Sequence, residues 1–251
     1  MDIKGKVALI TGGGTGLGRE IAVQLAREGM HVAINYSRSE QDALDTVKEL
    51  QELGVKAQAI QTDLSGPTAV ADIKQMIEGV AESFGRLDLL INNAGVTKFV
   101  AFPNLDELEE ADWDYILKVN TKVPFFTTRA AVPIMRQNGG GQVINTTSVA
   151  GTRAAGSSIA YAVSKAGMTH LTKCLAVALA PDIRVNAVAP GLLLTRWGQK
   201  FSPEQIKAMA QQAPLKKVTG IEDTAAAYVM LARNDSITGQ IIHVDAGISL
   251  A

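Results

Sequence analysis

The sequence predicts an α/β fold with a single domain, in which seven mainly parallel strands form a doubly wound sheet flanked by helices. Short runs rich in valine, isoleucine and leucine alternate with longer amphipathic stretches, which is the pattern of βαβ units. No linker or change of composition divides the 251 residues, 47% of which are hydrophobic, so the chain can bury one large core. We therefore expect residues 1–251 to form one domain whose crossovers are right-handed.

The expected elements follow in order along the chain. Strands are expected at Val7 to Ile10, His31 to Asn35, Ala57 to Gln61, Leu87 to Ile91, Gly141 to Thr146, Arg184 to Val188 and Gln240 to Val244. Helices are expected at about Gly16 to Glu28, Glu40 to Leu53, Thr68 to Phe84, Trp113 to Gln137, Ser158 to Leu179, Pro203 to Gln211 and Glu222 to Ala232. The acidic cluster from Asp106 to Asp114 is interpreted as a solvated helix start, because carboxylates stabilise the positive end of a helix dipole.

A glycine-rich segment lies between the first strand and the first helix. It reads Thr11-Gly12-Gly13-Gly14-Thr15-Gly16-Leu17-Gly18. Glycines permit a tight turn and let the main chain approach a pyrophosphate, which then sits at the positive end of the next helix. The spacing fits T-G-x-x-x-G-x-G and departs from the general fingerprint G-x-G-x-x-G. Because it follows the first strand of a Rossmann-like sheet, we interpret it as a dinucleotide-binding turn.

The end of the second strand predicts which dinucleotide is preferred. An acidic residue there would bind a ribose 2'-hydroxyl, but no carboxylate occurs before Glu40. Ser37 and Arg38 instead offer a hydroxyl and a guanidinium that suit a 2'-phosphate. We infer that NADP(H) is preferred and that NAD(H) is possible, while a surface arginine without a ligand stays the alternative.

Tyr161 and Lys165 lie four residues apart in an expected helix, so their side chains share one face. A neighbouring cation favours the phenolate and lowers the pKa of a tyrosine from its usual value of about 10. The pair is therefore a candidate acid/base device, although such spacing is by itself common on helix surfaces.

Read together, these motifs resemble the short-chain dehydrogenase/reductase family from end to end. The resemblance rests on the glycine turn, Asn92-Asn93-Ala94-Gly95, Ser148, the Tyr161/Lys165 pair and Pro190-Gly191. It implies that Tyr161 is the general acid in reduction and the general base in oxidation, and that Lys165 lowers its pKa and holds the nicotinamide ribose. It further implies that Ser148 binds the substrate carbonyl oxygen and that Asn120 ties a water into the proton relay.

The resemblance also implies a set of cofactor contacts. These are Gly12, Gly14, Thr15, Gly16, Leu17 and Gly18 of the turn, Ser37, Arg38, Asp63, Leu64, Asn93, Ala94, Gly95, Tyr161, Lys165, Pro190, Gly191, Leu193 and Thr195. For several of them an ordinary turn or cap role is the alternative, as for Asn93 and Thr195.

The substrate pocket is expected beneath a mobile lid at about residues 192–212, whose leucines, Trp197, Phe201 and Met209 supply apolar surface. A ketone or aldehyde reductase is our first interpretation and a 3-oxoacyl-thioester reductase of fatty-acid synthesis the second. Carrier-protein-dependent relatives resemble one another in basic side chains that are missing at Gly139-Gly140-Gly141 and Ala180-Pro181-Asp182. A pteridine reductase is disfavoured by Gly16 and Ser148. Two alternatives belong to other classes of function: a non-catalytic NADP-binding sensor or scaffold, and a purely structural oligomer that binds no nucleotide.

Composition excludes other classes of protein. With a net charge of −1 the chain lacks the basic field that nucleic acid or anionic lipid requires. We find no signal peptide, no apolar run of about 20 residues and no metal-ligand spacing, and therefore expect a cytoplasmic protein without a membrane span or a metal. The single cysteine, Cys174, is expected to be a buried thiol. The final strand and tail resemble family segments that pack across subunits, which predicts a homodimer or homotetramer.

Overall fold

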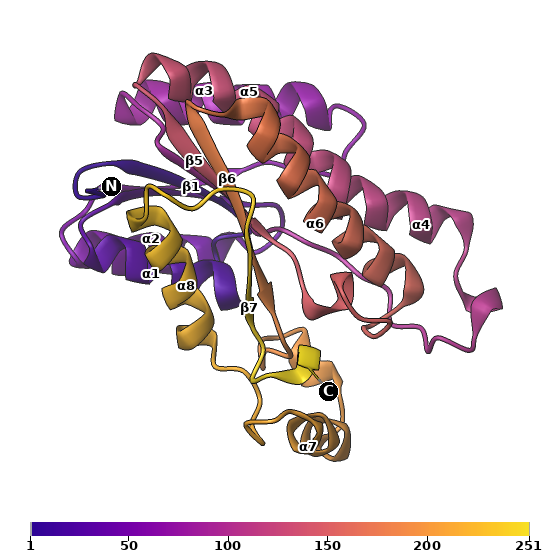
Figure 1. The fold of residues 1–251 in the computed structure, drawn as a ribbon. Coiled ribbons are helices and arrows are strands. Elements are labelled where there is room, and N and C mark those ends of the chain that lie inside the picture. The colour runs from indigo at the N-terminus through magenta and orange to yellow at the C-terminus, as the bar shows by residue number, and fades with distance from the viewer. Residues whose placement is uncertain (1, 251) are drawn as a thin grey trace.

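The computed structural model describes residues 2–250, apart from the side chain of Lys200. Met1 and Ala251 of the expected domain lie outside the described residues. Within residues 2–250, seven strands form a single sheet in the order β3-β2-β1-β4-β5-β6-β7, and every neighbouring pair is parallel (Figure 1). The strands are β1 (Val7–Thr11), β2 (His31–Tyr36), β3 (Ala57–Gln61), β4 (Leu89–Asn92), β5 (Gly141–Thr146), β6 (Ile183–Pro190) and β7 (Ile241–Val244). This confirms the predicted fold class.

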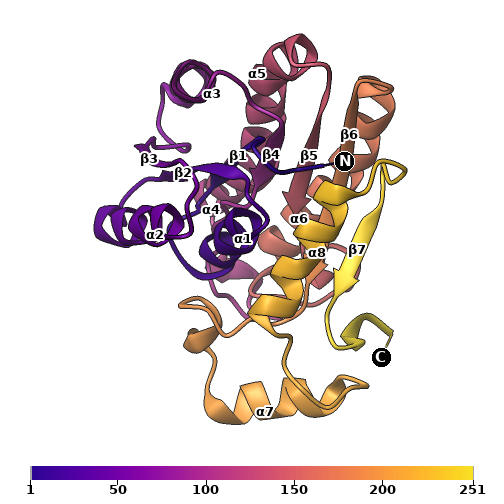
Figure 2. The ribbon, with the colours of Figure 1, turned by 90° about the vertical axis from the view of Figure 1, so that its left-hand side faces the viewer.

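Helices cover both faces of the sheet, as the doubly wound prediction requires (Figures 1 and 2). One core cluster packs α1 (Gly16–Arg27), α2 (Glu40–Glu52) and α8 (Ile221–Arg233) on one face. A second cluster packs α3 (Ala69–Phe84), α5 (Val123–Gln137) and α6 (Ile159–Leu179) on the other. The sheet is therefore buried on both sides, which explains the uninterrupted apolar runs of its central strands.

The helix expected at about Trp113 to Gln137 is present without a break in the chain's helical run, but it is not a regular α-helix throughout. The structure has α4 (Glu110–Leu117), a π-helical turn at Lys118–Lys122 and then α5. Pro124 has no backbone N–H to donate to the carbonyl of Asn120, and its ring would clash with that carbonyl in a regular α-helix. The wider π-helical turn relieves this conflict.

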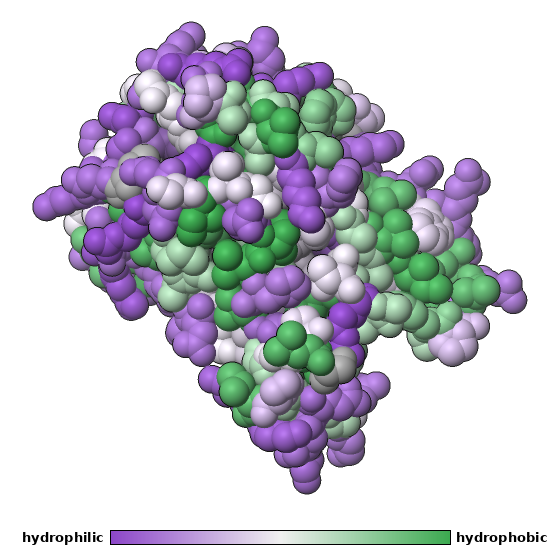
Figure 3. Space-filling model, in the orientation of Figure 1, coloured by the Kyte–Doolittle hydropathy of each residue, from purple (hydrophilic) through white to green (hydrophobic). Residues whose placement is uncertain are grey.

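Surface features complete the description. Most of the surface in Figure 3 is hydrophilic, and hydrophobic side chains gather over α4 and α6, where Tyr115 and Val163 are among the exposed residues.

Cys174 is exposed rather than buried, because it lies on an outward position of α6, so that expectation is wrong. In the described part of the chain, no helix has the length and apolar character needed to span a membrane.

Candidate active site

A cavity of about 780 Å³ opens at the carboxyl ends of the strands, next to β1 and β4, where the strand order reverses direction. It brings together all the expected cofactor contacts and three of the four expected catalytic residues. Its lining includes Gly12, Gly14, Thr15, Gly16, Leu17, Gly18, Ser37, Arg38, Asp63, Leu64, Asn93, Ala94, Gly95, Ser148, Tyr161, Lys165, Pro190, Gly191, Leu193 and Thr195. Asn120 does not line the cavity.

The glycine turn fits a dinucleotide pyrophosphate. Gly12 and Gly16 have φ values of +63° and +53°, which disfavour side chains. A Cβ on Gly18 would lie 2.3 Å from the Gly12 carbonyl oxygen, so only glycine allows the turn to close this tightly. No side chain caps the start of α1 and its first turn contains no acidic residue, which leaves its N–H groups available to an anion.

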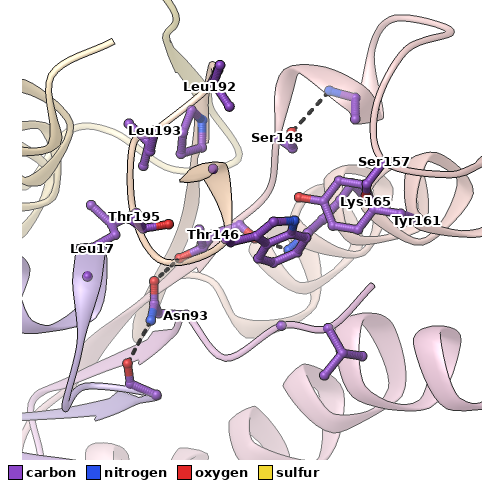
Figure 4. Close-up of a pocket in the computed structure, with 18 of the residues that line it drawn as sticks. Leu17, Asn93, Thr146, Ser148, Ser157, Tyr161, Lys165, Leu192, Leu193 and Thr195 are labelled. Carbon is purple, nitrogen blue, oxygen red and sulfur yellow. Dashed lines mark hydrogen bonds between the residues drawn. The ribbon is translucent and has the colours of Figure 1, made fainter. Parts of the chain in front are cut away.

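Asn93 fastens this turn to the end of β4. Its side-chain amide donates to the carbonyls of Thr11 and Gly12, at 3.1 and 3.2 Å. In return the Thr11 hydroxyl oxygen accepts the backbone N–H groups of Asn93 and Ala94, each at 3.0 Å. Figure 4 shows Asn93 between the turn and Thr146, whose hydroxyl is 3.5 Å from the Asn93 Oδ1. The amide thus fixes the floor of the cavity rather than serving only as a turn residue.

The mouth of the cavity at β2 carries the groups expected to select the cofactor. Ser37 and Arg38 are exposed there, and Arg38 forms no ion pair with any other residue from 2 to 250. On the adjacent β3 side, hydrogen bonds from the hydroxyl and backbone N–H of Ser65 lower the pKa of Asp63, with smaller contributions from the charges of Arg38 and Lys118. The guanidinium of Arg38 is therefore exposed near Asp63 at this end of the cavity.

Ser148 and Tyr161 face the same space from two segments. Ser148 precedes a short 3-10 turn after β5 and accepts the N–H of Ala150 at 3.2 Å. Tyr161 lies in the first turn of α6, where Ser158 caps the helix by accepting the Tyr161 N–H at 3.2 Å. In Figure 4 the Tyr161 hydroxyl points towards Ser148, which is the arrangement expected of two groups that bind one carbonyl oxygen.

Burial controls the titration of the Tyr161/Lys165 pair. It raises the pKa of Tyr161 to about 12, and a hydrogen bond with Ser148 opposes that rise only in part. The Lys165 ammonium donates to the Thr146 carbonyl at 2.8 Å and lies 5.7 Å from the centre of the Tyr161 ring. Burial also lowers the pKa of Lys165 to about 8. Desolvation therefore dominates the tyrosine pKa and Ser148 opposes it, while the expected effect of Lys165 on that pKa stays a prediction.

Asn120 is fully buried in the π-helical turn behind the cavity. Its Oδ1 accepts the N–H of Val96 at 2.8 Å, and its amide nitrogen donates to the Val96 carbonyl and the Ser164 hydroxyl, both at 2.9 Å. A Cβ on Gly95 would lie 3.5 Å from the Asn120 Oδ1 and 3.6 Å from the Lys165 Nζ. Asn120 therefore joins the loop after β4 to α6 and contacts the lining of the cavity at Gly95 and Val96.

Residues 192–212, which contain a 3-10 turn at Gly198–Lys200 and helix α7 (Pro203–Gln212), contribute to the lining of the cavity. Trp197, Phe201 and Met209 line it as expected. Sequence reasoning missed Phe99, whose ring packs against Trp197 and Phe201, and Arg153, which lines the cavity and donates to the Ile248 carbonyl at 2.6 Å. Both lie in loops, where no periodic pattern could have indicated them.

Comparisons with known proteins agree with this geometry. A family model for short chain dehydrogenase matches residues 6–206. The 3-oxoacyl-acyl-carrier-protein reductase FabG of Staphylococcus epidermidis is 38% identical over 246 residues, which cover 97% of this chain and 98% of that protein.

Two solved structures share the fold. The RhlG/NADP complex of Pseudomonas aeruginosa has a TM-score of 0.90 and 31% identity, covering 99% of this chain and 98% of that one. FolM alternative dihydrofolate reductase 1 from Brucella canis, complexed with NADP, has a TM-score of 0.88 and 28% identity, covering 100% and 97%. The chain therefore belongs to the short-chain dehydrogenase/reductase family and is an NAD(P)-dependent oxidoreductase that acts on small-molecule substrates.

Proposed function

We propose that the protein reduces a ketone or an aldehyde to an alcohol, reversibly and with NADP(H), using Tyr161 as general acid/base. The observation that carries the proposal is the convergence of the Tyr161 and Ser148 hydroxyls on one space in the cavity that also contains the dinucleotide turn. When bound, the nicotinamide supplies the hydride.

Residues of this chain stabilise the negative charge that develops on the carbonyl oxygen and supply its proton. Ser148 donates a hydrogen bond to the carbonyl oxygen, where negative charge develops, and Tyr161 gives that oxygen its proton. A phenol whose pKa is about 12 stays protonated at neutral pH, which suits an acid in the reductive direction. Lys165, fixed on the Thr146 carbonyl, holds the nicotinamide ribose. For Asn120 the proposed water relay has less support, because both ends of its amide already bind protein groups.

NADP(H) is preferred in this proposal because Ser37 and Arg38 lie exposed at the mouth of the cavity. A guanidinium without a carboxylate partner can bind a 2'-phosphate bidentately. The structures of RhlG and FolM, both solved with NADP, are consistent with this choice. NAD(H) stays possible.

Reduction of 3-oxoacyl thioesters is the second candidate, and the similarity to FabG favours it. Against it, the turn at Gly139-Gly140-Gly141 offers no basic side chain to an acidic carrier. At the end of α6, Asp182 accepts from Arg136 at 3.0 Å, so this corner presents an ion pair rather than a free cation.

NADPH absorbance distinguishes these candidates. We expect NADPH consumption with simple ketones and aldehydes, and a loss of about 100-fold to 10,000-fold in kcat for Tyr161→Phe, the range that general acid catalysis contributes. The variant retains the ring and should keep its affinity for NADPH, measured by titration. Turnover of acyl thioesters alone would favour the second candidate. Tight NADPH binding without turnover on either panel would instead indicate a sensor or scaffold.

Three further expectations belong to this proposal. Residues 192–212 act as a mobile lid, since they cover the cavity and join the rest of the fold at its edge. The protein assembles as a homodimer or homotetramer, which is consistent with exposed apolar side chains on α5 and α6. Its location in the cytoplasm stays a prediction.

A further inference from the structure

Aromatic rings cluster at the substrate end of the cavity. The rings of Trp197 and Tyr161 lie edge to face, with centres 5.3 Å apart and planes at 69°. The Phe99 ring lies 6.4 Å from Trp197 and 5.5 Å from Phe201, again in edge-to-face geometry. Trp197 and Phe201 line the cavity, and Phe99 packs against both. We call Phe99, Trp197 and Phe201 the aromatic wall.

The backbone holds the indole of Trp197 in a defined place. The N–H of Gln199 donates to the Thr195 carbonyl at 2.9 Å, which closes the turn that contains Trp197. A Cβ on Gly198 would lie 1.9 Å from the Leu193 carbonyl oxygen, so this turn packs more closely than any side chain allows. Next to Trp197, both terminal guanidinium nitrogens of Arg196 bind the Asp42 carboxylate.

The rest of this end of the cavity is largely apolar. Its lining includes Val149, Ala150, Ala155, Leu192, Met209 and Ala213. The charged groups that also line it have protein partners: Arg153 donates to the Ile248 carbonyl and Lys217 lies 3.7 Å from Asp223. Asp245 accepts the N–H groups of Gly247 and Ser249. A substrate therefore meets rings and aliphatic groups beside Tyr161.

We propose that the aromatic wall selects carbonyl substrates that carry a flat aromatic ring beside the carbonyl over aliphatic substrates of equal size. The proposal rests on the proposed function, because it names the substrate class of the same site. A carbonyl oxygen that reaches Tyr161 and Ser148 places its substituent against the indole, since the two rings are in contact. An aromatic substituent gains edge-to-face contacts there, whereas a flexible chain gains none and loses rotational freedom.

The first test compares acetophenone with 2-octanone, two ketones of eight carbons, as substrates with NADPH. We expect the ratio of kcat/KM for acetophenone to kcat/KM for 2-octanone to fall about tenfold in Trp197→Ala, which corresponds to about 1.4 kcal/mol. The fall should be smaller in Trp197→Phe. Trp113→Phe is the matched control and should keep the wild-type ratio. An unchanged or increased ratio in Trp197→Ala would overturn the proposal, as would a wild-type enzyme that prefers 2-octanone to acetophenone.

The second test needs no turnover. The chain has two tryptophans, so Trp113→Phe leaves Trp197 as the fluorescent reporter. In the presence of NADP⁺, which cannot reduce a ketone, we expect acetophenone to change its emission, with half-saturation about tenfold below that of 2-octanone. If no ketone is reduced with NADPH but acetophenone still binds preferentially, the proposed function fails and the aromatic wall stands. If ketones are reduced with NADPH while neither ketone affects Trp197, the proposal for the aromatic wall is wrong and the function stands.

Discussion

Lys165 shows how a single buried charge shapes the site. Its ammonium lies inside the fold against the Thr146 carbonyl, and burial lowers its pKa to about 8. In the unfolded chain the lysine pKa is about 10.4. Below pH 8 both states carry the charge, and the native state bears the cost of burying it. As pH rises from 8 to about 10.4 the native lysine loses its proton first, so this cost disappears.

Lys165→Met should therefore stabilise the protein at pH 7. A pKa difference of this size corresponds to about 3 kcal/mol, from which loss of the bond to Thr146 subtracts roughly 1 kcal/mol. We expect a gain of about 2 kcal/mol in the free energy of unfolding at pH 7 that closes towards pH 10, measured by urea denaturation. Lys173→Met, an exposed lysine on the same helix, is the control and should show no such pH dependence. A gain that persists unchanged at pH 10 would contradict this account.

Arg38 offers a second test at the level of one residue. Arg38→Ala should raise KM for NADPH about tenfold or more, because a charge-assisted contact to the 2'-phosphate is lost, and should leave KM for NADH nearly unchanged. Arg27→Ala, at the end of α1 and outside the cavity, is the control. Equal losses with both cofactors would show that Arg38 does not read the 2'-phosphate.

For single residues, the spacing in the sequence predicted where the side chains lie better than it predicted their pKa values. The interval between Tyr161 and Lys165 places both on α6 and both in the cavity. It does not predict the direction of the tyrosine pKa, because burial depends on Trp197 from a segment that lies more than thirty residues away. Phe99 was unpredictable for the same reason, since its role exists only through rings brought to it by the fold.

Among the helices and turns, the features that depend on local sequence were predictable and one irregular turn was not. The glycine turn was predictable because its geometry depends on local backbone freedom and its place after β1. The π-helical turn at Lys118–Lys122 was missed because helical periodicity continues through it. Pro124 was the available signal, since a proline cannot complete the hydrogen bond to Asn120. The wide turn carries Asn120 inward to bind Val96, which a regular helix would not predict.

The segment 192–212 is attached to the opposite side of the cavity by one ion pair. Arg196 binds both oxygens of Asp42 on α2, at 2.8 and 2.7 Å. A Cβ on Gly16 would lie 3.1 Å from the Thr195 methyl group, so the same segment also rests on the glycine turn. The pair therefore joins the segment 192–212 to the helix that follows Ser37–Ser39.

Weakening this pair should release the lid. We expect Arg196→Gln and Asp42→Asn each to raise the dissociation rate of NADPH about two- to fivefold, as suits an exposed pair, and the double variant to add little. The wild-type rate should rise with salt and the variants' rates should respond less. Stopped-flow fluorescence measures these rates. Arg233→Gln removes a similarly exposed pair with Glu28 between α8 and α1 and serves as control. Additive effects in the double variant would contradict the coupling.

For the whole molecule, the central prediction is assembly. Large apolar side chains remain exposed on α5 and α6, including Phe125, Val163 and Val177, and Val177 is 83% exposed. Hydrophobic surface of this kind is typical of faces that become covered in oligomers. The doubly wound fold class was predictable at this scale because alternating strands and helices with right-handed crossovers form a parallel sheet covered on both faces. The partner that covers an exposed surface cannot be predicted from the periodicity of one chain.

Sedimentation velocity tests this assembly. We expect a homodimer or homotetramer, and we expect Val163→Glu with Val177→Glu to shift the distribution towards smaller species by burying charge in the contact. Val70→Glu, at a residue of α3 that is 44% exposed, is the control. A wild-type protein that sediments only as a monomer would refute the prediction.

The ion pair between Arg196 and Asp42 also bears on the order in which substrates bind and products leave. The segment that this pair holds in place rests on the glycine turn through Thr195, so a dinucleotide bound along that turn would lie beneath it. We therefore expect the nucleotide to enter before the carbonyl compound and to leave after the alcohol. Product inhibition should show this compulsory sequence: NADP⁺ competes with NADPH, whereas the alcohol inhibits noncompetitively against NADPH.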